Sequence, residues 1–247
     1  MIVLLCLSAV FPVLMGTEVV NSNCLLIATD CSDVYSSGKT SSGVYTVSSI
    51  DGPVQIYCDM IPSGEKHSKG HWTVILRRMD GEVNFFRPWD SYKRGFGNKE
   101  GEHWLGLEFI HLLTRRNRYK LRVDLEDFDG TKAYAVYESF SVDSEAHGYK
   151  LHVSGFVDGG AGDSLSNHNQ MKFSTFDKDQ DLRGNENCAL QHSLGGFWYK
   201  TCYDTNPTGL YLWGKDDGSL NIGANWYYWK KNRKSLKAIT WKITSVM

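Results

Sequence analysis

The sequence predicts an α+β fold with a mainly antiparallel sheet, one flanking helix and an irregular C-terminal third. Three observations support this. Runs of β-branched and aromatic residues alternate with Gly-containing turns as far as residue 157. Residues 102–114 have apolar side chains at helical spacing. Beyond Gly159 the periodicity fades and Gly, Asn, Asp and Trp dominate, as in the long connections that carry binding residues.

The first half supplies the strands and the helix. In EHWLGLEFIHLLT the residues Leu105, Phe109, Leu112 and Leu113 share one helical face, which predicts a helix over 102–114. With a hydrophobic content of 41%, the chain has enough apolar material for a sizeable core around it. We expect residues 72–157 to build an antiparallel sheet beside this helix. The predicted strands are 44–50, 53–60, 72–79, 119–128, 132–142 and 148–157.

The N-terminus reads MIVLLCLSAVFPVLMG and then turns polar at Thr17 and Glu18. An apolar run of this length is too short to span a bilayer and is typical of a secretory signal peptide. No Lys or Arg precedes the run, so a buried N-terminal strand is the alternative. The prediction is a signal peptide over 1–16, an N-terminal segment over 17–30 and one large domain over 31–247.

Five cysteines remain once Cys6 leaves with the signal peptide: Cys24, Cys31, Cys58, Cys188 and Cys202. The sequence leaves their pairing open, but the short loops favour Cys31 with Cys58 and Cys188 with Cys202. Cys24 is the odd one. It lies ahead of the domain, where it is either an interchain bridge in a homo-oligomer or a free or differently paired thiol.

Composition and motifs exclude several functional classes. A net charge of −1 gives no overall attraction to nucleic acid or anionic membranes. No HExxH or GxSxG motif is present, so we expect no catalytic residues. One local exception to the charge balance is KKNRKSLK, residues 230–237. This run is either a site for sulfated matrix polysaccharides or a solvated face.

The stretch STFDKDQDLRG places carboxylates at Asp177, Asp179 and Asp181. Like charges this close repel one another unless a cation lies among them. The stretch is no EF-hand, because the sixth and twelfth positions counted from Asp177 are Leu182 and Cys188 instead of Gly and Glu. Two interpretations remain: a Ca²⁺ loop completed by main-chain carbonyls, or a solvated acidic turn with Lys178 and Arg183 as counter-ions.

Several long motifs resemble the fibrinogen C-terminal domain family over residues 30–245. They include DGEVNFFRPWDSYKRGFGNKEGEHWLGLEFIHLLT, YKLRVDLEDFDG, AGDSLSNHNQMKFSTFDKDQD, FWYKTC and GLYLWG. The resemblance implies a small N-terminal subdomain closed by a disulfide matching Cys31 and Cys58, a central sheet, and an irregular calcium-binding C-terminal subdomain. It implies a second disulfide matching Cys188 and Cys202 in that last part.

The resemblance also implies where Ca²⁺ binds. The family's two Asp ligands carry over to Asp179 and Asp181. Its two carbonyl ligands carry over to Arg183 and Asn185 by direct count, with Gly184 as the alternative, because the stretch before Cys188 is one residue longer here. Asp177 then lies outside the ligand set and adjusts the local charge.

A pocket for acetylated sugars lies beside the calcium loop in this family. The positions that carry over to it are Ser193, Thr201, Cys202, Tyr203, Leu220, Asn221 and Asn232. The resemblance implies a cis peptide bond between Thr201 and Cys202. Three positions depart from the family pattern: Tyr203 replaces His, Leu220 and Asn221 replace Tyr-Ala, and Asn232 replaces an aromatic residue. Loss of aromatic walls weakens the grip on a methyl group, which puts lectin activity in doubt.

Taken with the resemblance, the sequence predicts a secreted, calcium-dependent recognition protein of the extracellular matrix. It is expected to form a disulfide-linked homo-oligomer that binds elastic-fibre or collagen components, without nucleic acid, membrane span or catalysis. The alternative function is a soluble innate-immune lectin for acetylated glycans.

Overall fold

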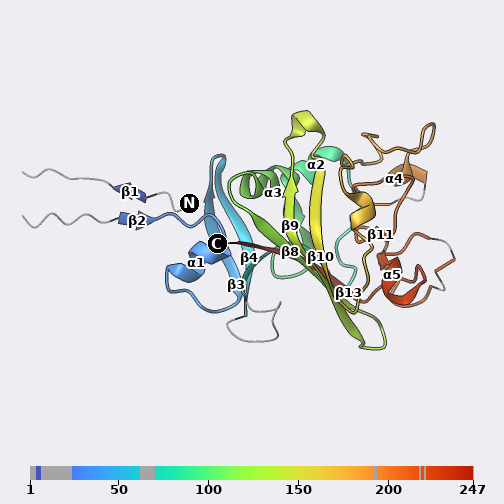
Figure 1. Ribbon diagram of the computed structural model, residues 1–247, viewed down its shortest axis with the longest axis horizontal. Helices are drawn as coiled ribbons and strands as arrows, with labels where there is room; N and C mark the ends of the chain where they lie inside the picture. The colour runs from blue at the N-terminus through green and yellow to red at the C-terminus, as the bar shows by residue number, and fades with distance from the viewer. Residues whose placement is uncertain are drawn as a thin grey trace, which may run out of the picture.

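The computed structural model describes the backbone of residues 4–6, 24–61, 70–191, 194–216, 218–219 and 221–246, and the side chains from residue 27 onward. Figure 1 shows a central sheet with the N-terminal elements at one end and the irregular C-terminal part at the other. The short strand β1 (Leu4–Cys6) pairs antiparallel with β2 (Cys24–Leu26), with Cys6 opposite Cys24. The rest of the expected signal peptide lies outside the described residues, so its assignment stays a prediction.

The described residues form one nine-stranded sheet whose main order is β10-β9-β8-β13-β5-β4-β3, with β6 and β7 attached beside β5. Every pairing in it is antiparallel, which agrees with the predicted fold class. Because β4 hydrogen-bonds to β5, the N-terminal subdomain shares the sheet of the main body. The strands are β3 (Gly43–Ser49), β4 (Gly52–Ile61), β5 (Gly70–Arg78), β6 (Phe96–Gly97), β7 (His103–Trp104), β8 (Tyr119–Glu126), β9 (Lys132–Val142), β10 (Leu151–Gly159) and β13 (Ala238–Ser245).

The central strand β13 is the element that the sequence pattern did not reveal. It pairs with β8 on one side and β5 on the other, so the C-terminus returns to the middle of the sheet. Ile239, Trp241 and Ile243 are fully buried, and so is most of the opposite face. A strand covered on both faces shows no polar-apolar alternation, which is why periodicity did not identify it.

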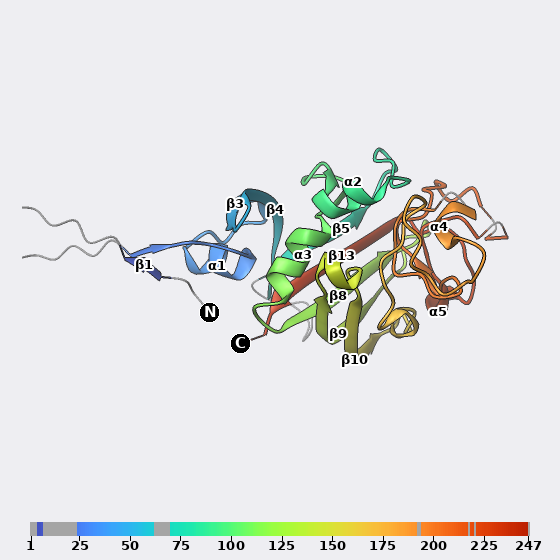
Figure 2. The same cartoon turned by 90° about the horizontal axis from the view of Figure 1, so that it is seen from above.

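The predicted helix is present but shorter, as α3 (Leu107–Thr114). Gly106 ends the preceding stretch with φ +114, and a Cβ there would meet the backbone of Arg94 at 2.9 Å. The first residues of the predicted helix instead form β7, which pairs with β5 and β6. Figure 2 shows α3 and α2 (Trp89–Arg94) on one side of the sheet. The Thr114 hydroxyl accepts from the amide of Val142 in β9 at 3.2 Å, which ties α3 to the sheet.

Residues 160–237 contain short elements joined by irregular chain, as predicted. They are η2 (Ser166–His168), α4 (Cys188–Gln191), β11 (Thr205–Asn206), β12 (Asn225–Trp226) and α5 (Tyr227–Lys230), while η1 (Glu145–His147) precedes β10. An aromatic cluster fixes this part to the sheet. Trp198 has ring-centroid distances of 5.1 Å to Phe173, 6.2 Å to Trp104 and 6.3 Å to Trp241. Large rings therefore replace regular strands as the main source of burial here.

Two disulfide bonds join the pairs that the sequence favoured. Cys31 in α1 (Cys31–Ser36) bonds to Cys58 in β4, with the Cα atoms 5.4 Å apart. Cys188 at the start of α4 bonds to Cys202, with the Cα atoms 5.6 Å apart. The first bond closes the N-terminal subdomain, and the second lies in the irregular C-terminal part.

Replacing Trp241 tests the importance of β13. We expect Trp241→Ala to lower the free energy of unfolding by about 3–5 kcal/mol, because a fully buried indole leaves a large cavity. Trp241→Phe should cost much less, since it keeps a ring and removes an indole N–H that lacks a hydrogen-bond partner. Urea unfolding of the non-reduced protein measures both, with the exposed Ile50→Ala as control. Equal midpoints for Trp241→Ala and the control would contradict the assigned role of β13.

Candidate functional site

The acidic loop is anchored to the body by Asp177. One carboxylate oxygen of Asp177 accepts from the amide of Trp89 at 2.9 Å and from the hydroxyl of Thr175 at 2.7 Å. The ammonium of Lys178 lies 3.8 Å from the centre of the Trp89 ring. Asp177 and Lys178 therefore fix the loop against the start of α2 and leave the cation site to the later residues.

Asp181 folds the chain around its own carboxylate. Its two oxygens accept from the amides of Arg183 and Cys188, each at 2.8 Å. Asp179 accepts from the amide of Asp181 at 3.1 Å. Burial raises the pKa of the Asp181 carboxyl, the amides of Cys188 and Arg183 oppose that rise, and the adjacent Asp179 carboxylate adds to it. The two carboxylates therefore repel each other and are stabilised by a positive charge.

The expected counter-ions of the solvated-turn interpretation point elsewhere. Lys178 lies over Trp89, and Arg183 pairs with Glu186 at 2.6 Å. Within the part of the chain that the structure describes, no Lys or Arg forms an ion pair with Asp179 or Asp181. The acidic pair thus lacks the internal neutralisation that a simple solvated turn would have.

The main chain after Asp181 offers further oxygen atoms. Gly184 has φ +78, and the stretch 183–185 is a series of bends. Across the described residues, the carbonyls of Arg183, Gly184 and Asn185 accept no main-chain hydrogen bond. No group of three or more His, Cys, Asp or Glu side chains that could hold a metal occurs in the described ranges. The residues present nevertheless fit a hard cation, because Ca²⁺ accepts carbonyl oxygens beside two carboxylates.

A pocket of about 160 Å³ opens beside this loop. Three of the residues implied by the family resemblance line it, namely Cys202, Tyr203 and Asn221. The other two lining residues are Arg183, from the acidic loop, and Arg233, from the basic run. The sequence singled out both arginines, but for other roles. Nothing in the spacing of 50 residues between them indicated that they meet.

The remaining pocket predictions fall in three places. Thr201 is exposed next to the pocket, and the Thr201–Cys202 peptide bond is cis, as the resemblance implied. Asn232 lines a different cavity, of about 250 Å³, together with Asp127 and Asp216. Ser193 and Leu220 lie outside the described residues.

Tyr203 and Arg233 form the fixed side of the pocket. A guanidinium nitrogen of Arg233 donates to the carbonyl of Tyr203 at 3.0 Å, and its central carbon lies 5.0 Å from the Tyr203 ring and 5.3 Å from the Tyr227 ring. The Tyr203 hydroxyl donates to the carbonyl of Asn221, whose backbone is left-handed at φ +53. Burial raises the pKa of the Tyr203 hydroxyl, and the nearby Arg233 opposes the rise.

A buried histidine supports the backbone behind the pocket. Nδ1 of His168 lies 2.7 Å from the carbonyl of Trp198, and the amide of Asp204 donates to its Nε2 at 3.1 Å. These partners require a neutral ring with the proton on Nδ1. Burial lowers the pKa of His168 to about 4, so the ring stays neutral at physiological pH.

The acidic loop and the pocket form one unit. The Cys188–Cys202 disulfide joins the end of the loop to the pocket wall. The amide of Leu182 donates to the carbonyl of Lys200 at 2.9 Å, and a guanidinium nitrogen of Arg183 lies 3.2 Å from the sulfur of Cys202. A change in the loop therefore reaches the pocket through covalent and hydrogen-bonded contacts. We refer below to residues 179–185 with the five lining residues as the loop-pocket site.

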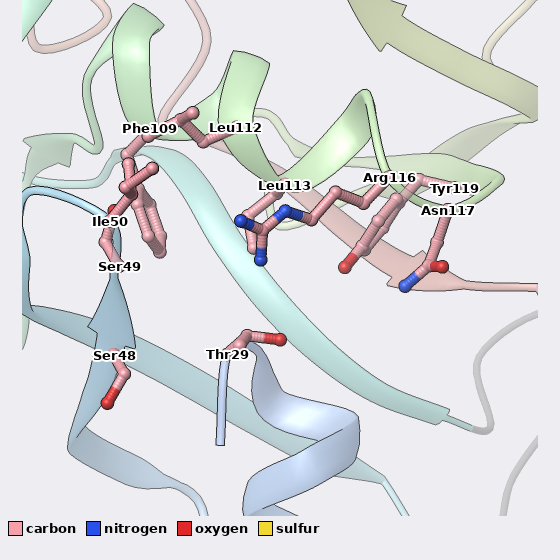
Figure 3. Close-up of a pocket in the computed structure, with 10 residues that line it drawn as sticks. All are labelled: Thr29, Ser48, Ser49, Ile50, Phe109, Leu112, Leu113, Arg116, Asn117 and Tyr119. Carbon is pink, nitrogen blue, oxygen red and sulfur yellow. The ribbon is translucent and has the colours of Figure 1, made fainter. Parts of the chain in front are cut away.

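A separate hollow lies between the N-terminal subdomain and α3. Figure 3 shows Phe109, Leu112 and Leu113 on one side of it and Thr29, Ser48 and Ser49 on the other. Its volume is about 20 Å³, room for about one water molecule. It is a packing junction, and it lies on the N-terminal subdomain, away from the loop-pocket site.

The basic run 230–237 is only partly available for a ligand. Lys230 pairs with Asp127 at 2.7 Å, and Lys237 pairs with Glu126 at 2.6 Å. Arg233 belongs to the pocket, while Lys231 and Lys234 are exposed. The structure thus divides the run into two lysines bound to β8 and its following turn, and three cations near the pocket.

Comparison with known proteins decides the family. Residues 27–246 match the family model described as fibrinogen beta and gamma chains, C-terminal globular domain. This chain is a fibrinogen C-terminal domain protein. The fibrinogen-like globe domain of human ANGPTL6 has the same fold, with a TM-score of 0.81 and 38% identity over 89% of this chain and 96% of that one. A lamprey fibrin D-dimer complexed with the peptide Gly-His-Arg-Pro-amide gives a TM-score of 0.77 at 34% identity, covering 87% and 72% of the two chains.

Among fibrinogen C-terminal domain proteins, two kinds of relative match well. Microfibril-associated glycoprotein 4 from Homo sapiens is 49% identical over 89% of this chain and 86% of its own length, and the Bos taurus protein is 46% identical over 94% and 91%. Fibrinogen C domain-containing protein 1 from Homo sapiens is 47% identical over 87% of this chain and 46% of its own length. The stretches DLEDF, GFVDGGAGDSLS and FSTFDKDQDL resemble microfibril-associated glycoprotein 4, and that resemblance is confirmed. Fibrinogen C-terminal domains are binding modules, in agreement with the expected lack of catalysis.

His168 predicts an acid-sensitive site. Its pKa is about 4 when folded and about 6.5 when unfolded, so the unfolded chain binds the proton first as the pH falls. The free energy of unfolding should therefore drop by about 3 kcal/mol between pH 6.5 and pH 4 from this group alone. His168→Asn, which keeps a donor toward Trp198, should flatten the pH profile of urea unfolding.

The control is His147→Asn, an exposed change that should leave the profile as in the wild type. His103 also has a pKa lowered by burial to about 4, so the slope in His168→Asn is reduced and not abolished. A wild-type slope in His168→Asn would show that His168 does not carry this acid sensitivity.

Proposed function

We propose that this fibrinogen C-terminal domain protein is a secreted, calcium-dependent recognition protein of the extracellular matrix. Its ligands are elastic-fibre or collagen components, bound through the C-terminal subdomain. The observation that carries the proposal is the loop-pocket site: an uncompensated carboxylate pair linked by a disulfide to a pocket at the position that the family resemblance implied. The printed name of the microfibril-associated relatives supports a matrix setting.

Ca²⁺ is the proposed cofactor, held by the side chains of Asp179 and Asp181 and the carbonyls of Arg183 and Asn185, with Gly184 as the alternative carbonyl. The ion would supply the positive charge that relieves the repulsion between the two carboxylates. The chain's own residues do the rest. Asp181 closes the turn through two amides, and Asp177 holds the loop to α2.

The N-terminal region fits secretion and assembly in this proposal. Residues 1–16 are the proposed signal peptide, residues 17–30 the segment that carries Cys24, and residues 31–247 the recognition domain. Cys24 is the proposed interchain bridge of a homo-oligomer. In the described part of the chain, no helix combines the length and apolar character needed to cross a membrane.

An acetyl-binding lectin is the second candidate function. The cis bond between Thr201 and Cys202 and the placement of Cys202, Tyr203 and Asn221 around one pocket favour it. The nature of the walls disfavours it, because Asn221 and two arginines stand where a methyl group needs apolar contacts. Matrix recognition is therefore the leading proposal.

Calcium removal tests the cofactor. We expect EDTA to lower the melting temperature of the wild type by roughly 5–10 °C, since an ion present at about 100 times its Kd contributes about 2.7 kcal/mol. The double variant Asp179→Asn, Asp181→Asn should melt at the same temperature with Ca²⁺ and with EDTA. The exposed Asp51→Asn serves as a charge-matched control and should keep the wild-type response. A wild-type response to EDTA in the double variant would overturn the ligand assignment.

A binding panel tests the partner class. Full-length non-reduced protein on a sensor surface should bind tropoelastin or fibrillar collagen in Ca²⁺, and an excess of free N-acetylglucosamine should not displace it. Binding should fall about tenfold or more in EDTA, if the loop must be ordered for docking. Displacement by the acetylated sugar would favour the lectin function, and absence of binding to both matrix proteins would contradict matrix recognition.

A further inference from the structure

The pocket of the loop-pocket site contains two guanidinium groups and, among the described residues, no carboxylate in its lining. We propose that it binds a single anionic substituent, the sulfate or carboxylate of an acidic matrix polysaccharide. The inference rests on the proposed matrix function and deepens it by naming the chemical class of the ligand. It departs from an acetyl ligand because of the residues that line this pocket.

Arg233 is held ready for an anion before any ligand arrives. One of its nitrogens is used by the carbonyl of Tyr203, and its plane is enclosed by the rings of Tyr203 and Tyr227. A guanidinium has five N–H donors, so the contact to Tyr203 leaves others for a ligand. Because the side chain is already ordered, little conformational entropy is lost on binding, and the planar fork matches two oxygens of a sulfate or carboxylate.

Arg183 supplies the second cation from the opposite wall. One of its terminal nitrogens lies 3.2 Å from the sulfur of Cys202, and the other pairs with Glu186 at 2.6 Å. The Glu186 side chain is half exposed, so this pair is weakened by solvent and can exchange its carboxylate for a ligand anion. The pocket therefore has one fixed cation and one partly compensated cation.

The remaining lining excludes an apolar ligand. Beside the arginines it has the edge of a disulfide, the buried Tyr203 and the exposed Asn221. A methyl group placed there would keep two guanidinium groups from water without replacing their hydrogen bonds, which is unfavourable. An anion satisfies the same donors.

The surroundings favour a polysaccharide that bears repeated anions. A pocket of about 160 Å³ admits one substituent and not a whole chain. Next to it in the sequence stand the exposed Lys231 and Lys234, whereas Lys230 and Lys237 are bound to Asp127 and Glu126. One anion in the pocket and neighbouring anions over the exposed lysines describe a polar chain with regularly spaced charges. Since the net charge is −1, this attraction is local to the site.

The test uses the full-length secreted protein in Ca²⁺ and four probes of similar length. They are a chondroitin sulfate hexasaccharide, a hyaluronan hexasaccharide that has carboxylates but no sulfate, neutral N-acetylchitohexaose, and a glutamate hexapeptide. Isothermal titration at about 50 and 150 mM NaCl measures each affinity, with salt expected to weaken ionic binding. We expect the sulfated probe, or both acidic glycans, to bind at least tenfold more tightly than the other two. Sulfate-only binding identifies the sulfate ester as the ligand, and equal binding of both glycans shows that a carboxylate is sufficient.

Variants separate the pocket from a diffuse basic surface. Arg233→Gln should weaken the acidic glycan about tenfold or more, whereas Lys234→Gln, which removes the same charge from an exposed position of the same run, should weaken it less than about threefold. Arg233→Lys keeps the charge, guards against a folding defect and should retain only part of the affinity because it lacks the fork. Melting temperatures of all three confirm folding.

Two results would overturn the inference. One is equal loss in Arg233→Gln and Lys234→Gln, and the other is binding of the neutral glycan or the peptide as tightly as the acidic glycans. Either result leaves the matrix function intact if tropoelastin or collagen still binds. Conversely, tight binding of acidic glycans without binding to either matrix protein would uphold the anion pocket and reject the proposed protein partners.

Discussion

The fold depends on the position of β13 between β8 and β5. This strand brings the last residues of the chain into the middle of the sheet, so the C-terminal part must leave the sheet at β10 and return through residues 160–237. The ammonium of Lys242 in β13 is almost fully buried and lies 2.8 Å from both Asp59 in β4 and Asp124 in β8. A buried ammonium is costly without partners, so the three strands are specified in this order as well as stabilised by their apolar faces.

The irregular part between β10 and β13 relies on other forces than strand pairing. Its large rings are buried against the sheet, and the Trp198 indole donates to the carbonyl of Tyr149 at 2.7 Å, which satisfies a buried polar group. Carboxylates and a neutral histidine accept main-chain amides that have no strand partner. The backbone is thereby free to place carbonyls and side chains toward one side, where a regular sheet would have used them internally.

Charges of opposite sign lie next to each other in the loop-pocket site. Asp179 and Asp181 form an acidic pair, while Arg183 and Arg233 line the adjoining pocket. Arg183 belongs to both, since its main chain lies in the acidic loop and its side chain reaches the pocket wall at Cys202. A cation at the loop and an anion in the pocket would favour each other, by direct attraction and through this shared residue. Such coupling is reciprocal, so each ligand would strengthen the binding of the other.

The sequence by itself determined the family, the α+β class, most strands of the sheet, the favoured disulfide pairs and the acidic loop. These features are encoded locally, in side-chain periodicity, in short cysteine loops and in long contiguous motifs. It also indicated Arg183 and the run 230–237 as charged segments. The tertiary structure alone decided that Arg183 and Arg233 line one pocket, that Lys230 and Lys237 are paired elsewhere, and that β13 occupies the centre of the sheet. The physical reason is that contacts between distant residues depend on how the chain returns, and a strand buried on both faces carries no periodic signal of that return.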